Sequence, residues 1–205
     1  MKLIVVGNGL FTELQGHLID RFDTVVRLSS AKVKGWEPLV GSKKDILSVS
    51  RIENYEGYDK IWLGNPMGLS STPQRAVNEA YPNGLIMNES LDRCYQQGEF
   101  NINEHPSLGL ITIFMALEYG APFFKTPITI TGFDFSHEGC SKYYWDNTPN
   151  KKYEPSLEYG HHNPNKERKV LKQLINDGKV KLLNPRSIYL LEDDLNPTFI
   201  DFHIG

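Results

Sequence analysis

The chain opens with MKLIVVGNGLFTEL, residues 1–14, in which an apolar, β-branched run leads into a small polar turn at Gly7, Asn8 and Gly9 and then into a helix-like segment. We refer to these three residues as the glycine turn. When a strand passes through such a turn into a helix, unpaired backbone N–H groups and the positive end of the helix dipole favour an anion at the same point. The stretch therefore predicts an α/β fold whose first strand ends at a phosphate or nucleotide site.

Strand-like and helix-like segments alternate along the rest of the chain. Short, mostly β-branched runs are expected to form strands at 2–7, 23–28, 44–50, 60–64, 84–88, 127–133 and 180–184. Segments with helix start or stop signals lie at 72–81, 88–97, 106–120 and 163–178. The alternation predicts an α/β, Rossmann-like single domain over 1–205, with a mostly parallel twisted sheet and helices on both faces.

Composition narrows the classes of partner. The chain has 205 residues, with 22 Lys and Arg against 25 Asp and Glu, and no long basic run. This balance weighs against a nucleic-acid partner and favours small molecules or sugars. Cys94 and Cys140 have no metal-ligand spacing, so neither a disulfide framework nor a zinc site is predicted. Because no stretch approaches the ~18 apolar residues of a membrane span, we expect a cytoplasmic protein.

Residues 134–163 interrupt the alternation with Tyr, Trp, Asn, Pro, Lys and His in no regular pattern. A loop of this length is usually either disordered or functional. Its aromatic content is unusual for a disordered segment. We therefore expect a lid over 134–163 rather than a linker.

Two common nucleotide motifs are incomplete. A Rossmann fingerprint beginning at Gly7 requires a third glycine at the position of Thr12, and the Gly-Lys-Ser/Thr ending of a phosphate-binding loop is missing. At the end of the second predicted strand, where an acidic residue would bind the ribose of NAD, the chain has Arg27, which suits a phosphate. An NADP-linked oxidoreductase thus remains an alternative, and the least favoured one.

A longer comparison is more specific. Residues 4–45, IVVGNGLFTELQGHLIDRFDTVVRLSSAKVKGWEPLVGSKKD, resemble the large sialylmotif of the family 29 sialyltransferases, and 105–135, HPSLGLITIFMALEYGAPFFKTPITITGFDF, resemble its small sialylmotif. YYWD at 143–146 is similar to the third motif, and the His-x-x-x-x-Glu of 162–167 is similar to the very small motif. The motifs occur in the order of that family. The bacterial family 42 sialyltransferases offer a looser comparison.

The resemblance implies a GT-A-like sialyltransferase variant of bacterial or viral type. Its activity would be inverting, metal-independent transfer of sialic acid, or of a related 2-keto sugar acid such as Kdo, from a CMP donor to a hydroxyl of a glycan or glycolipid. No cofactor beyond the CMP-activated donor is implied, and a lipid-linked acceptor would permit peripheral membrane association. A non-catalytic CMP- or sugar-binding module on the same fold is the alternative, because fold alone does not fix function.

The resemblance also assigns residues. The donor would be bound by Gly7, Asn8, Gly9, Arg27, Ser29, Ser107, Leu108, Gly109, Tyr143 and Tyr144. His162 would be the general base, since an imidazole suits proton transfer near neutral pH. Glu167 and Asp146 would support the site, the two tyrosine hydroxyls would assist the leaving phosphate, and Asp134 or Asp146 are alternative bases.

Three of these positions depart from the family pattern. Ser29 stands where Asn is usual, Leu108 where Thr is usual, and Tyr143 where His is commoner. The departures concern the identity of the donor sugar more than the fold.

Overall fold

We analysed a computed structural model of the chain. It describes residues 1–11, 13–50, 57–63, 85–86, 88–101, 104–120, 123–124, 126–134, 141–149, 162–185 and 187. The helix predicted at 72–81 lies outside the described residues.

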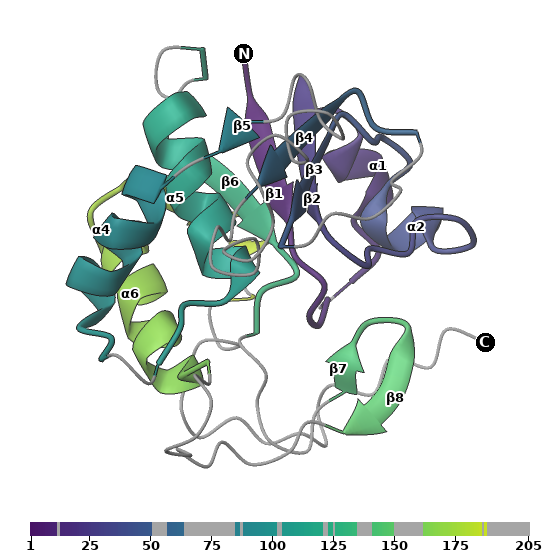
Figure 1. The fold of residues 1–205 in the computed structure, drawn as a ribbon. Helices are drawn as coiled ribbons and strands as arrows, with labels where there is room; N and C mark the ends of the chain where they lie inside the picture. Colours follow the sequence, from purple (N-terminus) through teal and green to yellow (C-terminus); the bar gives the residue numbers. More distant parts are fainter. Residues whose placement is uncertain are drawn as a thin grey trace, which may run out of the picture.

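The described chain is organised around a seven-stranded sheet in the order β5-β4-β3-β2-β1-β6-β9 (Figure 1). Its strands are β1 (Leu3–Val6), β2 (Thr24–Leu28), β3 (Ile46–Val49), β4 (Lys60–Leu63), β5 (Leu85–Ile86), β6 (Ile128–Thr131) and β9 (Val180–Leu182). Every neighbouring pair is parallel. The seven predicted strands and the parallel α/β fold class are confirmed.

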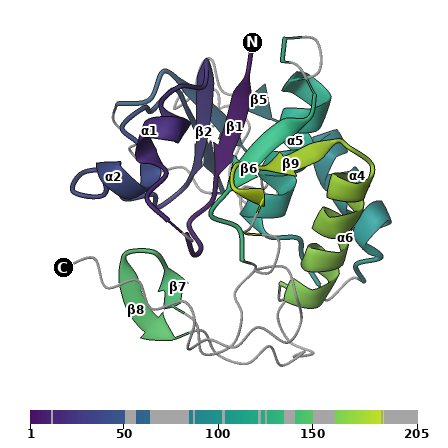
Figure 2. The same ribbon diagram turned by 180° about the vertical axis from the view of Figure 1, so that it is seen from behind.

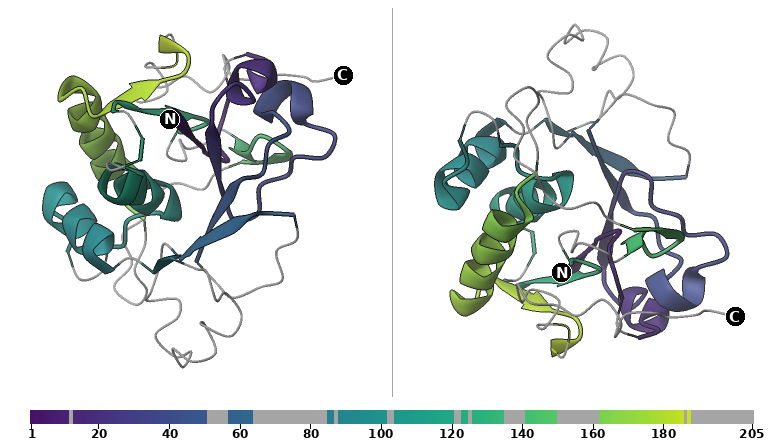
Figure 3. Two further views of the ribbon diagram at one scale, coloured as in Figure 1. Left: turned by 90° about the horizontal axis from the view of Figure 1, so that it is seen from above. Right: turned by 90° about the horizontal axis from the view of Figure 1, so that it is seen from below.

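Helices cover both faces of the sheet, as predicted. The short helices α1 (Gly16–Ile19) and α2 (Glu37–Val40) lie on one face, and α4 (Asn88–Gly98), α5 (Leu108–Gly120) and α6 (Pro164–Asn176) lie on the other (Figures 2 and 3). The sequence pattern predicted α4, α5 and α6. The sequence also predicted a helix directly after the glycine turn, but the described residues there are irregular until the four-residue α1 begins at Gly16. It did not resolve α2, which is also four residues long and too short to show a period.

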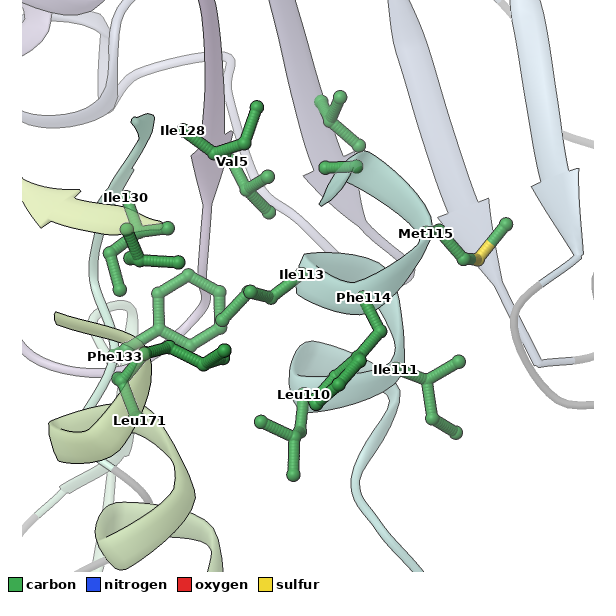
Figure 4. Close-up of a cluster of buried hydrophobic side chains, with 14 of the residues drawn as sticks. Val5, Leu110, Ile111, Ile113, Phe114, Met115, Ile128, Ile130, Phe133 and Leu171 are labelled. Atoms are coloured by element: carbon green, nitrogen blue, oxygen red, sulfur yellow. The ribbon is translucent and has the colours of Figure 1, made fainter. Parts of the chain in front are cut away.

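The first strand shows why the sheet is buried on both sides. Leu3 and Val5 pack into the cluster that includes α4, α5 and α6, whereas Ile4 and Val6 pack into the cluster that includes α1 and α2. Side chains alternate between the two faces of a strand, so a strand covered on both faces is apolar at every position. The larger cluster surrounds α5, whose side chains point toward both the strands and α6 (Figure 4).

The strand order changes direction between β1 and β6. Successive strands β1 to β5 are added outward on one side, and β6 and β9 lie on the other side of β1. Ligands of open α/β sheets bind at the carboxyl ends of strands at such a switch point. The glycine turn follows β1 at this edge, residues 132–134 follow β6, and α5 and α6 begin there (Figures 1 and 2).

A two-stranded antiparallel hairpin lies at the same edge. It consists of β7 (Ser141–Tyr143) and β8 (Asp146–Pro149) and falls inside the predicted lid (Figure 1). Residues 135–140 and 150–161 of the lid lie outside the described residues, so its opening and closing remain a prediction. Among the described helices, none combines the length and the apolar character that a membrane crossing requires.

Candidate active site at the carboxyl edge of the sheet

The glycine turn is held against the end of β6 by backbone hydrogen bonds. Gly7 N donates to Thr131 O at 2.8 Å, and Gly9 N donates to Gly132 O at 2.9 Å. A Cβ atom at Gly7 would lie 2.1 Å from the carbonyl oxygen of Gly132. Glycine is therefore needed here so that two backbone segments can approach closely.

Asp134 closes the turn from the other side. Its carboxylate is buried and accepts a 2.8 Å hydrogen bond from Leu10 N. A Cβ atom at Gly9 would lie 2.6 Å from Asp134 Oδ1. Sequence reasoning named Asp134 only as an alternative base, but its contacts make it a support for the backbone of the turn. Its position directly after a buried strand is the signal that could have found this role.

Asn8 connects the turn to its neighbours. Its Nδ2 donates to Ser29 O at 2.8 Å, and its backbone carbonyl accepts from Tyr144 N at 3.2 Å. Ser29 N in turn donates to Ser48 O at 2.8 Å. Asn8 Oδ1 is buried and has no hydrogen-bond partner among the described residues. The turn therefore presents one unused acceptor.

Tyr144 attaches the hairpin of β7 and β8 to the glycine turn. Its ring packs edge-on against Phe11 and Trp36, with centroids 5.5 and 5.6 Å apart, and its hydroxyl donates to Lys32 O. Burial raises the pKa of Tyr144 above its ordinary value. The Tyr144 hydroxyl therefore already donates to a backbone carbonyl, which argues against the predicted hydrogen bond from this hydroxyl to the leaving phosphate.

The neighbouring hairpin residues have the same degree of burial as Tyr144. Tyr143 and Trp145 are half-buried and their rings stack, with centroids 4.7 Å apart. Asp146 begins β8 and is also half-buried. Their roles in donor binding and support remain predictions.

Arg27 does not fit its predicted role. The side chain is fully buried, and its guanidinium donates to the carbonyls of Lys43 at 2.7 Å, Val40 at 2.9 Å and Gly41 at 3.0 Å. These bonds tie β2 to the end of α2 and the segment after it, which indicates a structural role in place of the predicted phosphate contact; Nη1 of the same guanidinium is buried without a hydrogen-bond partner among the described residues. The alternative of an NADP-linked oxidoreductase depended on a phosphate contact of Arg27, so it loses this support.

Ser107 and Glu167 join the starts of α5 and α6. Ser107 caps α5, because its carbonyl accepts from Ile111 N at 3.0 Å and its Oγ accepts from Leu110 N at 3.3 Å. Glu167 accepts from Ser107 N at 2.8 Å and from Ser107 Oγ at 2.5 Å. Burial raises the pKa of Glu167, while the nearby His162 and the two Ser107 donors act in the opposite direction. Ser107, predicted to touch the donor, spends its hydroxyl on this contact.

The next two predicted donor residues contribute to packing. Leu108 is half-buried against the larger cluster. A Cβ atom at Gly109 would lie 2.9 Å from Phe133 Cε1 and 3.5 Å from Leu28 Cδ1. Gly109 therefore lets the first turn of α5 approach the ends of β2 and β6.

His162 is exposed just before α6, and its ring is oriented by a single backbone contact. Nδ1 lies 2.8 Å from His105 O. A carbonyl can only accept, so Nδ1 carries the hydrogen, and in the neutral imidazole the lone pair is on Nε2. The structure thus presents a ring nitrogen that can take a proton. Asn163, the N-cap of α6, follows directly and fixes the start of the helix.

The described residues contain no group of three or more His, Cys, Asp or Glu that could hold a metal ion.

Comparisons with known proteins agree with this arrangement. The model of glycosyltransferase family 29 (sialyltransferase) matches residues 2–53 and 72–179. No curated protein matches the chain. Among solved structures, a mammalian sialyltransferase is 18% identical with a TM-score of 0.59, and the match covers 89% of this chain and 68% of that one.

A second solved structure, of a mammalian sialyltransferase in complex with Gal-beta-1-3GalNAc-ortho-nitrophenol, is 19% identical with a TM-score of 0.58 and the same coverage. At these identities the two structures establish the likeness of fold. The family match spans most of the chain, including the glycine turn, Ser107, His162 and Glu167. The chain belongs to glycosyltransferase family 29, the sialyltransferases, and is a glycosyltransferase.

Proposed function

We propose that the protein transfers sialic acid, or a related 2-keto sugar acid such as Kdo, from its CMP donor to a hydroxyl of a glycan or glycolipid. Transfer proceeds with inversion, without a metal or further cofactor, and His162 is the general base. The observation that carries the proposal is the 2.8 Å contact between His162 Nδ1 and His105 O, which leaves Nε2 as a proton acceptor.

The chemical step is a single displacement. The acceptor hydroxyl gives its proton to His162 Nε2 as its oxygen forms a bond to the anomeric carbon, and the bond from that carbon to the CMP phosphate breaks. Attack opposite the departing phosphate inverts the anomeric centre. In this step the imidazolium favours the ionised form of Glu167, against the burial that raises the pKa of this carboxyl, and the ionised carboxylate in turn stabilises the imidazolium.

The CMP half of the donor belongs at the switch point. Asn8 Nδ2 donates one of its two hydrogens to Ser29 O, and its buried Oδ1 has no hydrogen-bond partner among the described residues, so Oδ1 is an acceptor available to a ligand. An amide oxygen only accepts, and it therefore suits a ribose hydroxyl or the cytosine amino group better than a phosphate oxygen. The phosphate is assigned to the start of α5, where the dipole of a 13-residue helix is positive; Glu167 already accepts from Ser107 N and Oγ there, so the phosphate would share this helix start with that carboxyl group.

A single phosphate carries less charge than the diphosphate of other sugar donors, so its departure depends less on a divalent cation. We accordingly expect transfer to survive excess EDTA. Loss of activity that magnesium or manganese restores would contradict the metal-independent mechanism.

The test is transfer from CMP-sialic acid and CMP-Kdo to a panel of glycan acceptors by wild type and His162→Ala. The variant should still be stabilised thermally by CMP, which the glycine turn and the start of α5 hold, whereas NADPH and ATP should stabilise neither form. Its transfer rate should fall by a factor on the order of 10² to 10⁴.

The neighbouring His161→Ala is the matched control and should transfer at close to the wild-type rate. Equal activity in the two histidine variants would overturn the assignment of the base. CMP binding without hydrolysis or transfer by the wild type, over the whole panel, would favour the non-catalytic module instead.

A further inference from the structure

Glu104 and His105, which precede α5, make hydrogen bonds to Asn163 and His162, which precede α6. Glu104 Oε1 accepts from Asn163 Nδ2 at 2.6 Å, and His105 O accepts from His162 Nδ1 at 2.8 Å. The segment before α5 therefore forms hydrogen bonds with both the imidazole of His162 and the side chain of Asn163. Sequence reasoning assigned no role to Glu104, His105 or Asn163.

Glu104 is built into this place as a fixed charge. It is 7% exposed, and its carboxylate also accepts from Lys166 Nζ at 2.6 Å and from Asn101 N at 3.1 Å. Burial opposes ionisation, but the hydrogen bonds from Lys166, Asn163 and Asn101 outweigh it and hold the pKa of Glu104 below its usual value. A buried carboxylate with several donors is rigid, because each rotation would break a charge-assisted bond.

Asn163 divides its carboxamide between two tasks. Its Oδ1 accepts from Lys166 N at 3.2 Å and caps α6, while its Nδ2 donates to Glu104. Capping needs only the oxygen, so the contact with Glu104 is an additional use of this side chain. Lys166, in the first turn of α6, also donates through Nζ to Glu99 O at 2.8 Å.

His105 is anchored from a third element. Its Nδ1 shares a hydrogen bond with the hydroxyl of Tyr95, which belongs to α4, and the two rings meet edge-on with centroids 6.1 Å apart. The carbonyl that orients His162 is thus restrained by Tyr95 on one side and by the adjacent Glu104 on the other.

We propose that Glu104 is a positioning residue for sugar transfer, which acts through Asn163 and the adjacent His105 carbonyl to hold the imidazole of His162 in its reactive orientation. The inference rests on the proposed role of His162 as the base. A displacement of about 1 Å in such a group can lower a rate by ~10²-fold even when binding is unchanged.

The test compares kcat and KM for the CMP donor in Glu104→Gln and Asn163→Ser. Gln keeps the size of Glu104 but removes the charge, and Ser keeps a cap on α6 but removes the donor to Glu104. Both variants should lower kcat about 10- to 100-fold and leave KM within about twofold. Because Glu104→Gln weakens the contact that Asn163→Ser removes, the loss in the double variant should be smaller than the product of the single losses.

Glu118→Gln is the matched control. Glu118 lies in the last turn of α5, its side chain is 11% exposed, and it pairs with Arg93 at 3.0 Å. It is therefore a largely buried, ion-paired glutamate at the end of α5 remote from the site. Once rates are divided by the folded fraction, its kcat should equal that of the wild type.

A second readout does not depend on activity. Nitrogen NMR of the imidazole should show a smaller fraction of the Nδ1–H form of His162 in Glu104→Gln, and no change in Glu118→Gln. In a His162→Ala background, Glu104→Gln should cause no further loss of kcat. An unchanged kcat and an unchanged tautomer in Glu104→Gln and Asn163→Ser, alongside an inactive His162→Ala, would overturn the positioning role alone. Wild-type transfer by His162→Ala would instead overturn the proposed base.

Discussion

The substitution Gly7→Ala tests the reasoning about the fold-deciding turn. The added Cβ would meet the carbonyl oxygen of Gly132 at 2.1 Å and its carbonyl carbon at 2.8 Å. Both are backbone atoms, so no side-chain rotation can relieve the contact. The ends of β1 and β6 must therefore separate, at the point where the switch in strand order places the proposed donor site.

The cost can be worked from the contacts that are lost. Forcing a methyl group into a packed interior typically costs about 1–3 kcal/mol. Separation also weakens two backbone hydrogen bonds, Gly7 N to Thr131 O and Gly9 N to Gly132 O, at about 1 kcal/mol each. We expect a loss of about 3–5 kcal/mol in the free energy of unfolding, a large part of the ~5–15 kcal/mol that holds a typical domain together.

Gly9→Ala gives the comparison. There the Cβ would meet the side chain of Asp134, with Oδ1 at 2.6 Å, and a carboxylate can rotate away at the expense of its bond to Leu10 N. We expect about 1–3 kcal/mol. Gly178→Ala is the control for backbone strain alone, because Gly178 has a φ of +67° with nothing within 4 Å of an added Cβ, and it should cost about 1–2 kcal/mol.

Urea unfolding of the three variants, together with the thermal shift caused by CMP, measures these effects. Gly7→Ala should be the least stable and should lose the CMP shift, whereas Gly178→Ala should retain it. A Gly7→Ala protein no less stable than Gly9→Ala would refute the argument that the backbone contact fixes residue 7 as glycine.

Three further outcomes are expected. Arg27→Lys cannot reproduce the guanidinium fork that reaches three backbone carbonyls, so it should lower the free energy of unfolding in urea by about 2–4 kcal/mol. The KM of the folded fraction for the donor should stay within about threefold of the wild type, and a selective loss of donor binding would restore the phosphate role of Arg27. Because the pKa of Glu104 is lowered in the folded protein, its ionised form stabilises the fold at pH values above the pKa of about 4.3 that a Glu has in the unfolded chain. The difference in unfolding free energy between wild type and Glu104→Gln should therefore shrink as the pH falls from about 5 toward 3, and a difference independent of pH would contradict this. Tyr144→Phe, which removes the hydroxyl bonded to Lys32 O, should destabilise by about 1 kcal/mol and leave the rate of donor cleavage within about twofold of the wild type, whereas a rate loss of tenfold or more would return Tyr144 to the leaving group.

The sheet could be predicted because its signal is local. Each strand is a short apolar run ended by a polar residue or a glycine. Because both faces of the sheet are buried, the runs are continuous rather than alternating, and their short length and β-branched residues identify them as strands. The hairpin of β7 and β8 was missed for the opposite reason. Tyr144, in the turn of the hairpin, packs its ring against Phe11 and Trp36, which are distant in sequence, so the segment shows no period of its own.

The site was predictable where a residue type and its chemistry coincide. His162 and Glu167 were assigned through the resemblance of residues 162–167 to the very small motif. The structure puts the first in an exposed, oriented position and the second in contact with Ser107, and their roles in transfer stay predictions. Arg27 was misjudged because an arginine after a strand is equally consistent with a phosphate and with backbone carbonyls. Only the path of residues 40–43 decides between them.

The most informative contacts of the site join segments that the sequence keeps far apart. His105 and His162 are 57 positions apart, and Glu104 and Asn163 are 59 apart. They meet because α5 and α6 each precede a strand of a parallel sheet, β6 and β9, so both helices must begin at the carboxyl edge where the glycine turn also lies. The fold thus brings an acid with no motif of its own beside the imidazole. Loss of transfer without loss of donor binding in Glu104→Gln would therefore be a property of the topology, which no inspection of residues 104 or 162 alone could have anticipated.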